Sequence, residues 1–162
     1  GSVVRTESGE PFSLNDAVKR TPTVLIFYRG GWCPYCNAHL RQLQKSEPEL
    51  EKLGYQILAV STDTPEELRK FKSGNQLTYA LLSDTRLDVA ARFGLRYKVS
   101  ATYLKHVEQL DLQTKTGGYM LTPGAFVIDR QGVIRFAYVN NNYSVRVGQD
   151  KLLQAARDAL ND

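Results

Sequence analysis

Short apolar runs alternate with amphipathic runs along this chain, and that order limits the folds it can adopt more than any other feature. The apolar runs TVLIFY, YQILAVS and YALLSD occupy residues 23–28, 55–61 and 79–84, and their aliphatic and β-branched residues are typical of buried strands. A helical pattern follows each run. Strands separated by helices form parallel sheets with helices on both faces, so the sequence predicts an α/β fold.

Residues that start and stop helices mark the three helical patterns. The first covers about residues 33–53, with Gly54 as a stop and Pro48 as a residue that can kink or break the helix. The second opens at Thr64, an N-cap residue followed by a proline and two glutamates. The third spans residues 85–94 and ends at a glycine.

The last third of the chain carries a predicted hairpin and a closing helix. Residues 125–129 and 133–139 are expected strands joined by the tight turn DRQG, which adds an antiparallel edge to the sheet. Residues 149–160 have the pattern of an amphipathic helix. The segment 97–118 is long for a plain connection, so we expect a short helix around residues 101–109 and a place near a functional surface.

The composition is that of an ordinary globular protein and argues against several other classes. We expect residues 1–162 to form one domain, because this length suffices for a single sizeable core. No apolar run approaches the roughly 20 residues of a membrane helix. The net charge of +4 is spread over interleaved basic and acidic residues, without the basic patch of a nucleic-acid-binding protein.

Both cysteines lie three residues apart in the stretch FYRGGWCPYC, residues 27–36, and four explanations compete for them. A zinc site needs about four ligands, and two distant histidines complete that set poorly. Covalent haem attachment needs a histidine directly after Cys36, where the chain has Asn37. A structural disulfide would close so small a loop that it would constrain the unfolded chain little. Redox chemistry at the two thiols is the favoured hypothesis.

The redox hypothesis has a physical mechanism. A strand followed by Gly-Gly-Trp places Cys33 at a helix N-terminus, where free N–H groups and the helix dipole stabilise a thiolate. Pro34 suits the first helical turn because it has no N–H group to donate. Cys36 lies one turn further on, within reach of Cys33 for a disulfide. Arg29 either lowers the thiol pKa further or forms a salt bridge on the loop.

With these residues the chain resembles the thioredoxin superfamily, and more narrowly the peroxiredoxin-like branch of the alkyl hydroperoxide reductase/thiol-specific antioxidant family. The matching pieces are TVLIFYRGGWCPYC, ALLSD, TPGAFVIDRQGVIRFAYV and NNNYSVR, from about Glu7 onward. The resemblance implies a thioredoxin-like fold: a central mixed sheet with helices on both faces, and a peroxiredoxin-like insertion before the C-terminal hairpin. It also places NNNYSVR, residues 140–146, at the rim of the site.

The resemblance implies a second site residue pair at Thr122-Pro123. Thioredoxin-like folds hold a cis-proline beside the reactive cysteine, just before a strand, and Pro123 stands at that position. The backbone of Thr122 would then be free to pair with an extended substrate. The alternative is an ordinary trans proline that opens a strand.

Three positions depart from authentic peroxiredoxins. Those proteins hold a proline, a threonine and an arginine around the bound peroxide, and the matching positions here are Ile26, Gly30 and Pro123. The departures weaken the case for fast peroxidase activity and favour thiol–disulfide exchange. A bound peroxide would need other donors, such as the backbone N–H groups of Gly31 and Trp32.

Other residues near the motif have candidate roles. His39, on the helix face of Cys36, could take a proton from that thiol, or could be a solvated helix residue. Trp32 and Tyr35 could form an apolar landing surface for substrate, or Trp32 could pack against the fold. Phe27 stands where some relatives hold a carboxylate, so that proton route is expected to be absent, and His106 is interpreted as structural or solvated. Three carboxylates that follow strands are interpreted as turn or cap residues: Asp63, Asp84 and Asp129.

We therefore interpret the chain as a thiol–disulfide oxidoreductase in which Cys33 attacks and Cys36 resolves. The alternative is a peroxiredoxin-like thiol peroxidase that reduces hydrogen peroxide or organic hydroperoxides with the same cysteines. A third hypothesis is a non-enzymatic binding domain. The expected partners are a protein or small-molecule disulfide, or a hydroperoxide, and a thioredoxin-like redox partner. The sequence implies no metal, organic cofactor, nucleic acid or membrane span.

The N-terminus carries two further expectations. Gly1-Ser2 is typical of an expression scar, which is compatible with the loss of a signal peptide. The sequence alone therefore does not identify the cellular compartment. Related bacterial proteins include exported forms, which favours the periplasm over the cytoplasm. Family members usually carry a short strand before TESGEPFSL, residues 6–14, and the sequence predicts no such strand here.

Overall fold

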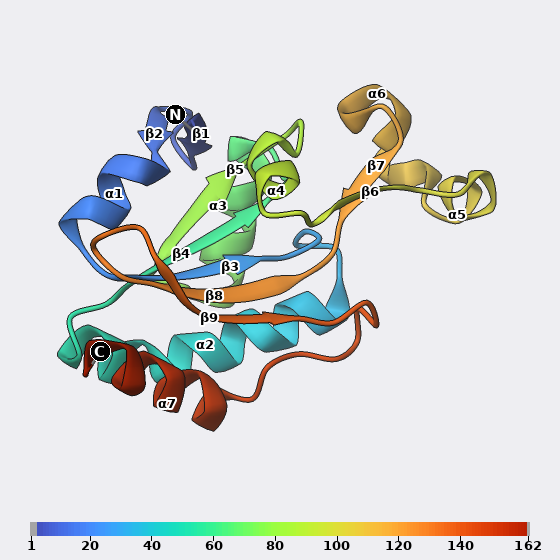
Figure 1. Cartoon of the computed structure of the whole chain (residues 1–162). Coiled ribbons are helices and arrows are strands. Elements are labelled where there is room, and N and C mark those ends of the chain that lie inside the picture. Colours follow the sequence, from blue (N-terminus) through green and yellow to red (C-terminus); the bar gives the residue numbers. More distant parts are fainter. Residues whose placement is uncertain (1–2, 162) are drawn as a thin grey trace.

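A computed structural model describes residues 3–161, and the expected expression scar Gly1-Ser2 lies outside them. The central sheet is mixed and covered by helices on both faces (Figure 1), which confirms the predicted α/β, thioredoxin-like fold. Within the described residues this sheet contains seven strands: β1 (Val3–Thr6), β2 (Pro11–Ser13), β3 (Thr23–Phe27), β4 (Gln56–Ser61), β5 (Ala80–Ser83), β8 (Gly124–Ile128) and β9 (Ile134–Val139).

The strand order is β2-β1-β5-β4-β3-β8-β9. The three predicted apolar runs form the parallel centre β5-β4-β3, in which Leu25 of β3 faces Leu58 of β4. The predicted hairpin β8-β9 adds antiparallel strands beside β3, as expected. All five residues of β3 are buried, so the loop that follows this strand leaves from the interior of the fold.

The expectation that no strand precedes residues 6–14 is wrong. β1 pairs antiparallel with β2, and also with β5, where Arg5 faces Ser83 and Thr6 faces Leu82. β1 has four residues and β2 three, too few to display a period that sequence analysis can detect. The pairing of β1 with β5 comes from tertiary contact, and β1 with β2 gives the sheet a second antiparallel edge.

Helices cover the two faces unequally. One face packs against α2 (Pro34–Lys52), α3 (Pro65–Asn75) and α7 (Gln149–Leu160), and the other against α1 (Leu14–Arg20) and α4 (Asp88–Arg92). Figure 1 shows α2 and α7 side by side beneath the sheet. Each face has its own apolar cluster, and both cysteines belong to the cluster under α2, α3 and α7.

The helix boundaries follow the predicted signals, with two differences. Thr64 caps α3 by accepting a hydrogen bond from the N–H of Glu67 at 3.2 Å, as predicted. Pro48 lies inside α2 and does not end it. The helix expected over residues 85–94 is shorter, because the Asp84 carboxylate accepts three backbone N–H groups and sets the start of α4 at residue 88.

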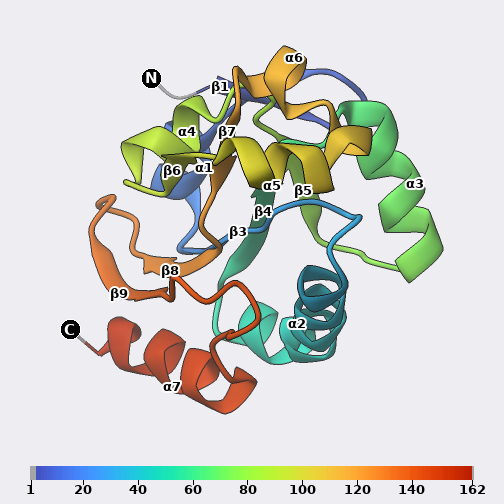
Figure 2. The same cartoon turned by 90° about the vertical axis from the view of Figure 1, so that its right-hand side faces the viewer.

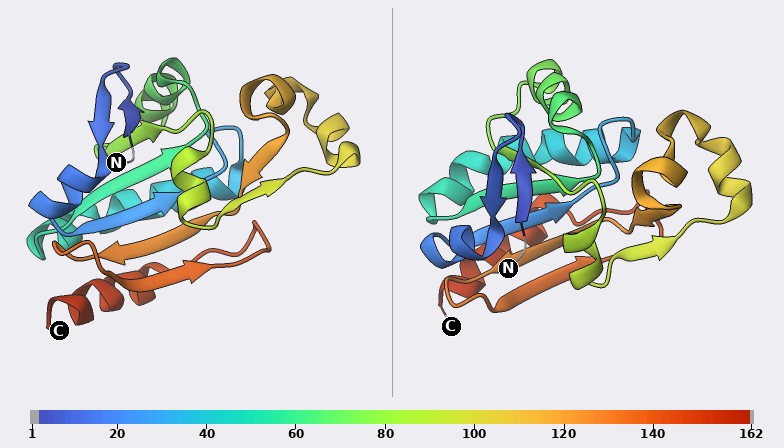
Figure 3. Two further views of the ribbon diagram at one scale, coloured as in Figure 1. Left: turned by 45° about the horizontal axis from the view of Figure 1, so that its top comes forward. Right: turned by 90° about the horizontal axis from the view of Figure 1, so that it is seen from above.

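The predicted irregular segment is a structured insertion. It contains β6 (Arg96–Lys98), α5 (Ala101–His106), a 3₁₀ turn η1 (Glu108–Leu110), α6 (Leu112–Thr116) and β7 (Tyr119–Leu121). β6 and β7 form a separate two-stranded antiparallel sheet, and the helices extend beyond one end of the main sheet (Figure 3). A small cluster of buried apolar residues holds the insertion together, and Trp32 of the cysteine motif packs against it.

The insertion therefore lies beside the cysteine motif. Figure 2 shows α5 and α6 on the side of the molecule where β3 passes into α2. The helix expected around residues 101–109 is present as α5 followed by η1. None of the helices within residues 3–161 has the length and apolar character to cross a membrane.

The apolar face of α2 sets the stability of the helix that carries the motif. Leu43 is fully buried in the cluster that includes both cysteines, whereas its neighbour Gln42 is exposed. We expect Leu43→Ala to lower the free energy of unfolding by about 2–5 kcal/mol, through lost burial and a residual cavity. Gln42→Ala, the control on the same helix, should change it by about 0.5 kcal/mol or less. Urea unfolding followed by circular dichroism measures both, and equal effects would contradict the assigned helix face.

Candidate active site

The two thiols meet at the amino end of α2. Cys33 is the N-cap residue, with extended backbone angles, and Pro34 takes the first helical position. The Sγ atom of Cys33 accepts a hydrogen bond from the backbone N–H of Cys36 at 3.4 Å. Both cysteines are free thiols and buried. The structure thus places the pair at the helix end that the sequence predicts.

The two thiols divide one negative charge unequally. A hydrogen bond from the Cys36 thiol is the main cause that lowers the pKa of Cys33 to about 6. The backbone N–H of Cys36 and the positive charges of Arg29 and Arg146 lower it further, against the effect of burial. The hydrogen bond to Cys33, burial and the neighbouring thiolate raise the pKa of Cys36. At neutral pH, Cys33 is the thiolate and Cys36 keeps its proton.

Arg29 is enclosed by aromatic rings. Its guanidinium carbon lies 4.8 Å from the ring centroid of Trp32 and 4.5 Å from that of Tyr143. Its Nη2 also donates to the hydroxyl of Tyr103, in the insertion. Only 4% of Arg29 is exposed, and no salt bridge among the described residues involves it. The alternative of a loop salt bridge is therefore wrong, and Arg29 is a buried cation beside the thiols.

Arg146 is a site residue to which the sequence analysis assigned no role. It lies in the loop between β9 and α7, and its Nη2 donates to the Sγ of Cys36 at 3.2 Å, across 110 residues of sequence. The available signal was the family-matching segment NNNYSVR, in which Arg146 is the only charged residue. A lone cation in a segment expected at the site rim could have been linked to the thiols, but the sequence does not show which thiol it reaches.

The same loop forms part of the rim through Tyr143. The rings of Tyr143 and Tyr35 meet edge to face at 5.8 Å, and each residue is close to half exposed. Tyr35 therefore lies at the surface beside the motif, where a landing surface was expected. Trp32 is partly buried and packs against two apolar clusters, which matches the alternative of packing against the fold.

The two positions before Trp32 require glycine, because neighbouring atoms leave no room for a Cβ. Gly30 has φ +152°, and a Cβ there would lie 2.3 Å from Trp32 Nε1 and 2.8 Å from Asp63 Oδ1. A Cβ at Gly31 would lie 2.8 Å from the ring of Phe71. A β-branched residue at such a φ is strained. The threonine that peroxiredoxins hold at the position of Gly30 is therefore incompatible with this loop.

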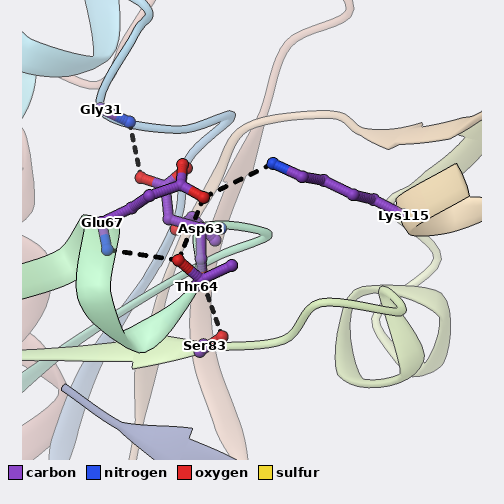
Figure 4. A network of polar contacts seen from close by, with 7 residues as sticks. Gly31, Asp63, Thr64, Glu67, Ser83 and Lys115 are labelled. Carbon is purple, nitrogen blue, oxygen red and sulfur yellow. Dashed lines mark hydrogen bonds and ion pairs between the residues drawn. The ribbon is translucent and has the colours of Figure 1, made fainter. Parts of the chain in front are cut away.

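Asp63 holds the glycine loop in place. Its Oδ2 accepts the backbone N–H of Gly31 at 2.8 Å, and its own carbonyl accepts the hydroxyl of Ser83 at 2.6 Å (Figure 4). This corrects the expectation that the N–H of Gly31 could serve a bound peroxide. Asp63 was interpreted as a turn residue, but its carboxyl is buried, and burial raises its pKa to about 6.

The carboxylate near the motif thus comes from the end of β4. Phe27, in β3, is buried and apolar, as predicted for the strand before the motif. Lys115 in the insertion lies near Asp63 and pairs with Glu67 of α3 at 3.5 Å (Figure 4). Asp129 accepts the N–H groups of two residues in the β8-β9 hairpin and is the turn residue that was predicted.

His39 is buried, so the alternative of a solvated helix residue is wrong. Burial and the charge of Arg146 lower its pKa to about 4, and its Nε2 has no hydrogen-bond partner among the described residues. Protonating it at pH 7 would cost about 4 kcal/mol, at about 1.4 kcal/mol per pKa unit. A neutral imidazole of this kind is a weak proton acceptor for Cys36. His106, in contrast, is exposed on α5.

The expectation of a cis-proline is wrong. No peptide bond within residues 3–161 is cis, so the Thr122–Pro123 bond is trans. The N–H of Thr122 donates to the carbonyl of Leu95 at 2.8 Å, which ties the chain between β7 and β8 to the start of the insertion. A trans bond is the lower-energy form for a proline that simply continues an extended chain. Pro123, His39 and Arg146 line the same narrow cavity.

The charge distribution predicts an acidic thiol. Ultraviolet absorbance of the reduced protein should show thiolate formation with a midpoint near pH 6. Cys36→Ala removes the main hydrogen bond to Cys33 and should raise that midpoint, while Cys33→Ser should abolish the transition near pH 6. An unchanged midpoint in Cys36→Ala would contradict the proton sharing between the thiols.

Buried Asp63 predicts a pH-dependent stability. The pKa of Asp63 is raised in the folded state. The stability that this carboxyl contributes to the fold is therefore fully present below about pH 4 and is lost as pH rises through about 6. The free energy of unfolding of Asp63→Asn minus that of wild type should therefore increase by about 2–3 kcal/mol when the pH is raised from 4 to 7.5, at about 1.4 kcal/mol per pKa unit. Urea titrations at both pH values measure the change, with Asp158→Asn as a surface control. A constant difference would rule out this linkage.

Comparisons with known proteins agree with the observed fold. The sequence pattern of the AhpC/TSA family matches residues 3–137. "Peroxiredoxin Bcp" of Escherichia coli is 33% identical over 89 residues, 55% of this chain and 56% of that protein. The match thus spans little more than half of that relative's length. "Peroxiredoxin Q, chloroplastic" of Sedum lineare is 25% identical over 159 residues, which cover 95% of this chain and 74% of that protein.

Solved structures share the architecture at low sequence identity. The crystal structure of "Peroxidoxin BcpB" from Mycobacterium tuberculosis has a TM-score of 0.76, with 22% identity over 97% of this chain and 92% of that one. The bacterioferritin comigratory protein of Xanthomonas campestris, whose structures concern alkyl peroxide reduction, has a TM-score of 0.77 and 18% identity over 98% and 91% of the two chains. On the family pattern and the thioredoxin-like fold together, the chain belongs to the AhpC/TSA family.

Proposed function

We propose that this protein is a thiol peroxidase in which Cys33 reduces a hydroperoxide and Cys36 resolves the oxidised cysteine. The observation that carries the proposal is the burial of a thiolate: Cys33 is 1% exposed, yet its pKa is lowered to about 6. Hydrogen peroxide has two heavy atoms and can enter so enclosed a position. The sulfur–sulfur bond of a folded protein reaches the same atom only if the site opens, as it must also do when a partner dithiol later reduces the Cys33–Cys36 disulfide.

Two further features favour peroxide reduction over thiol–disulfide exchange. Exchange was favoured partly because a cis-proline would leave the backbone of Thr122 free for an extended substrate. The Thr122–Pro123 bond is trans, and the N–H of Thr122 is already paired with the carbonyl of Leu95. Several similar proteins are named peroxiredoxins, in agreement with the peroxidase.

The first half-reaction oxidises Cys33. Its thiolate attacks one peroxide oxygen, the O–O bond breaks, and the leaving hydroxide or alkoxide takes up a proton to become water or an alcohol. Cys33 is then a sulfenic acid. Arg29, with a smaller contribution from Arg146, takes the place of the missing peroxiredoxin arginine in stabilising the negative charge of the reacting Cys33.

The second half-reaction forms the disulfide. The sulfur of Cys36 attacks the sulfur of Cys33, the S–O bond breaks, and hydroxide leaves to form water with the proton that Cys36 has given up. An external dithiol of the thioredoxin type then reduces the Cys33–Cys36 disulfide. The exposed rings of Tyr35 and Tyr143 offer that partner an aromatic contact surface beside the motif.

Thiol–disulfide exchange remains the second candidate. Cys33 and Cys36 are one helical turn apart, an arrangement that serves exchange as well as peroxide reduction. The non-enzymatic binding domain is the third candidate, and it requires that replacing Cys33 abolish no activity.

Rapid mixing separates the candidates. With excess hydrogen peroxide, the fluorescence of Trp32 should show a fast phase whose rate rises linearly with peroxide, followed by a phase independent of it. Cys33→Ser should abolish both phases, and Cys36→Ser only the second. Reduction of insulin disulfides by the same protein should be much slower. Fast insulin reduction with only slow oxidation by peroxide would reverse the assignment, and neither activity in wild type would favour the binding domain.

A further inference from the structure

Cys36 has more hydrogen-bond donors than a resolving thiol needs. Its Sγ accepts the backbone N–H of Arg29 at 3.4 Å and the guanidinium Nη2 of Arg146 at 3.2 Å. A neutral thiol is a weak acceptor, whereas a thiolate is stabilised strongly by a cationic donor. In the reduced protein the charge resides on Cys33, so the donors around Cys36 are arranged for a charge that Cys36 does not yet carry.

Oxidation of Cys33 changes this balance. Before the reaction, the hydrogen bond to Cys33, burial and the charge of Cys33 all keep Cys36 protonated. When Cys33 becomes a neutral sulfenic acid, its charge is lost and it no longer requires the proton of Cys36. Burial still opposes ionisation of Cys36. The hydrogen-bond donors from Arg29 and Arg146 favour ionisation, and they are no longer opposed by the charge of Cys33.

We propose that Arg146 is a catalytic residue of the second half-reaction, where its guanidinium stabilises the Cys36 thiolate that displaces hydroxide from the sulfenic acid of Cys33. The inference rests on the proposed peroxidase function. As Cys36 ionises, its proton passes to the sulfenic hydroxyl of Cys33; the S–S bond then forms as the S–O bond breaks, and that oxygen leaves as water. The guanidinium keeps all its protons throughout.

The loop holds Arg146 against the sulfur from both sides. On one side Tyr143 lies over the Arg29 guanidinium at 4.5 Å, and on the other Val147 is buried in the apolar cluster of α2 and α7. Within the loop the Asn142 carboxamide accepts both the N–H and the hydroxyl of Ser144. Arg146 itself is partly buried and forms no salt bridge within residues 3–161, so its charge is not neutralised by a carboxylate.

Among the other groups around Cys36, none brings a positively charged side-chain group into contact with its sulfur. Arg29 reaches Cys36 with its backbone N–H, while its guanidinium lies among aromatic rings. His39 is neutral near pH 7, because burial and Arg146 lower its pKa to about 4. Tyr28, the residue directly after β3, is buried, and burial raises its pKa, so it stays neutral as well. Arg146 is therefore the side chain whose removal should affect the ionisation of Cys36.

A titration that needs no peroxide provides the first test. In Cys33→Ser, Cys36 is the only thiol, and the serine carries no charge, as in the sulfenic acid state. The pKa of Cys36, followed by ultraviolet absorbance, should rise by roughly one unit or more when Arg146→Met is added, the size expected for a lost charge-assisted hydrogen bond. Arg146→Lys should restore part of the shift. Arg130→Met, an exposed arginine in the β8-β9 turn, is the matched control and should leave the pKa unchanged.

Peroxide kinetics provide the second test. Arg146→Met should slow the peroxide-independent phase roughly ten- to a hundredfold at pH 7 and move its pH profile upward, with a much smaller effect on the peroxide-dependent phase. Its longer-lived sulfenic acid should give more sulfinic acid at Cys33 by mass spectrometry. Equal titrations with and without Arg146, or an unchanged second phase, would overturn the inference. Absence of the first phase in wild type would instead count against the proposed peroxidase, and the titration would still decide the role of Arg146.

Discussion

A single negative charge shared by two buried sulfurs is the constraint around which the site is arranged. The Cys36 thiol donates a hydrogen bond to the Cys33 thiolate, and this hydrogen bond does more than the nearby cations to keep Cys33 ionised. Arg29 and Arg146 reach the pair from opposite ends of the sequence, and neither is neutralised by a carboxylate among the described residues. The segments that carry Tyr103 and Tyr143 are held in place through contacts with Arg29.

The loop before Cys33 explains why the chain departs from the peroxiredoxin pattern. Gly30 and Gly31 leave room for the carboxylate of Asp63 and for the indole of Trp32, and side chains at either glycine would collide with those neighbours or with Phe71. A threonine cannot occupy this backbone. Its absence therefore reflects a different loop, so it says little against peroxide chemistry, and positive charge near the thiols can come from arginines elsewhere in the chain.

Most of the fold could be predicted from the sequence, because β3, β4, β5, α2, α3 and α7 are long or strongly patterned. The helix start at Thr64 and the hairpin turn at Asp129 follow from local hydrogen bonds that these residue types typically form. β1, β2 and the pair β6-β7 were missed, since strands of three or four residues show no period; β5, equally short, was recognised from the apolar run YALLSD that contains it.

The sequence by itself determined that two thiols stand one turn apart at a helix N-terminus, because strand, glycines, Pro34 and cysteine spacing are all local signals. Only the tertiary structure decided which groups meet those thiols. Arg146 reaches Cys36 across 110 residues, Asp63 takes the N–H of Gly31, and the Thr122–Pro123 bond is trans. The physical reason is that charge, burial and access at a sulfur depend on whatever the folded chain places around it, and no local pattern encodes those neighbours.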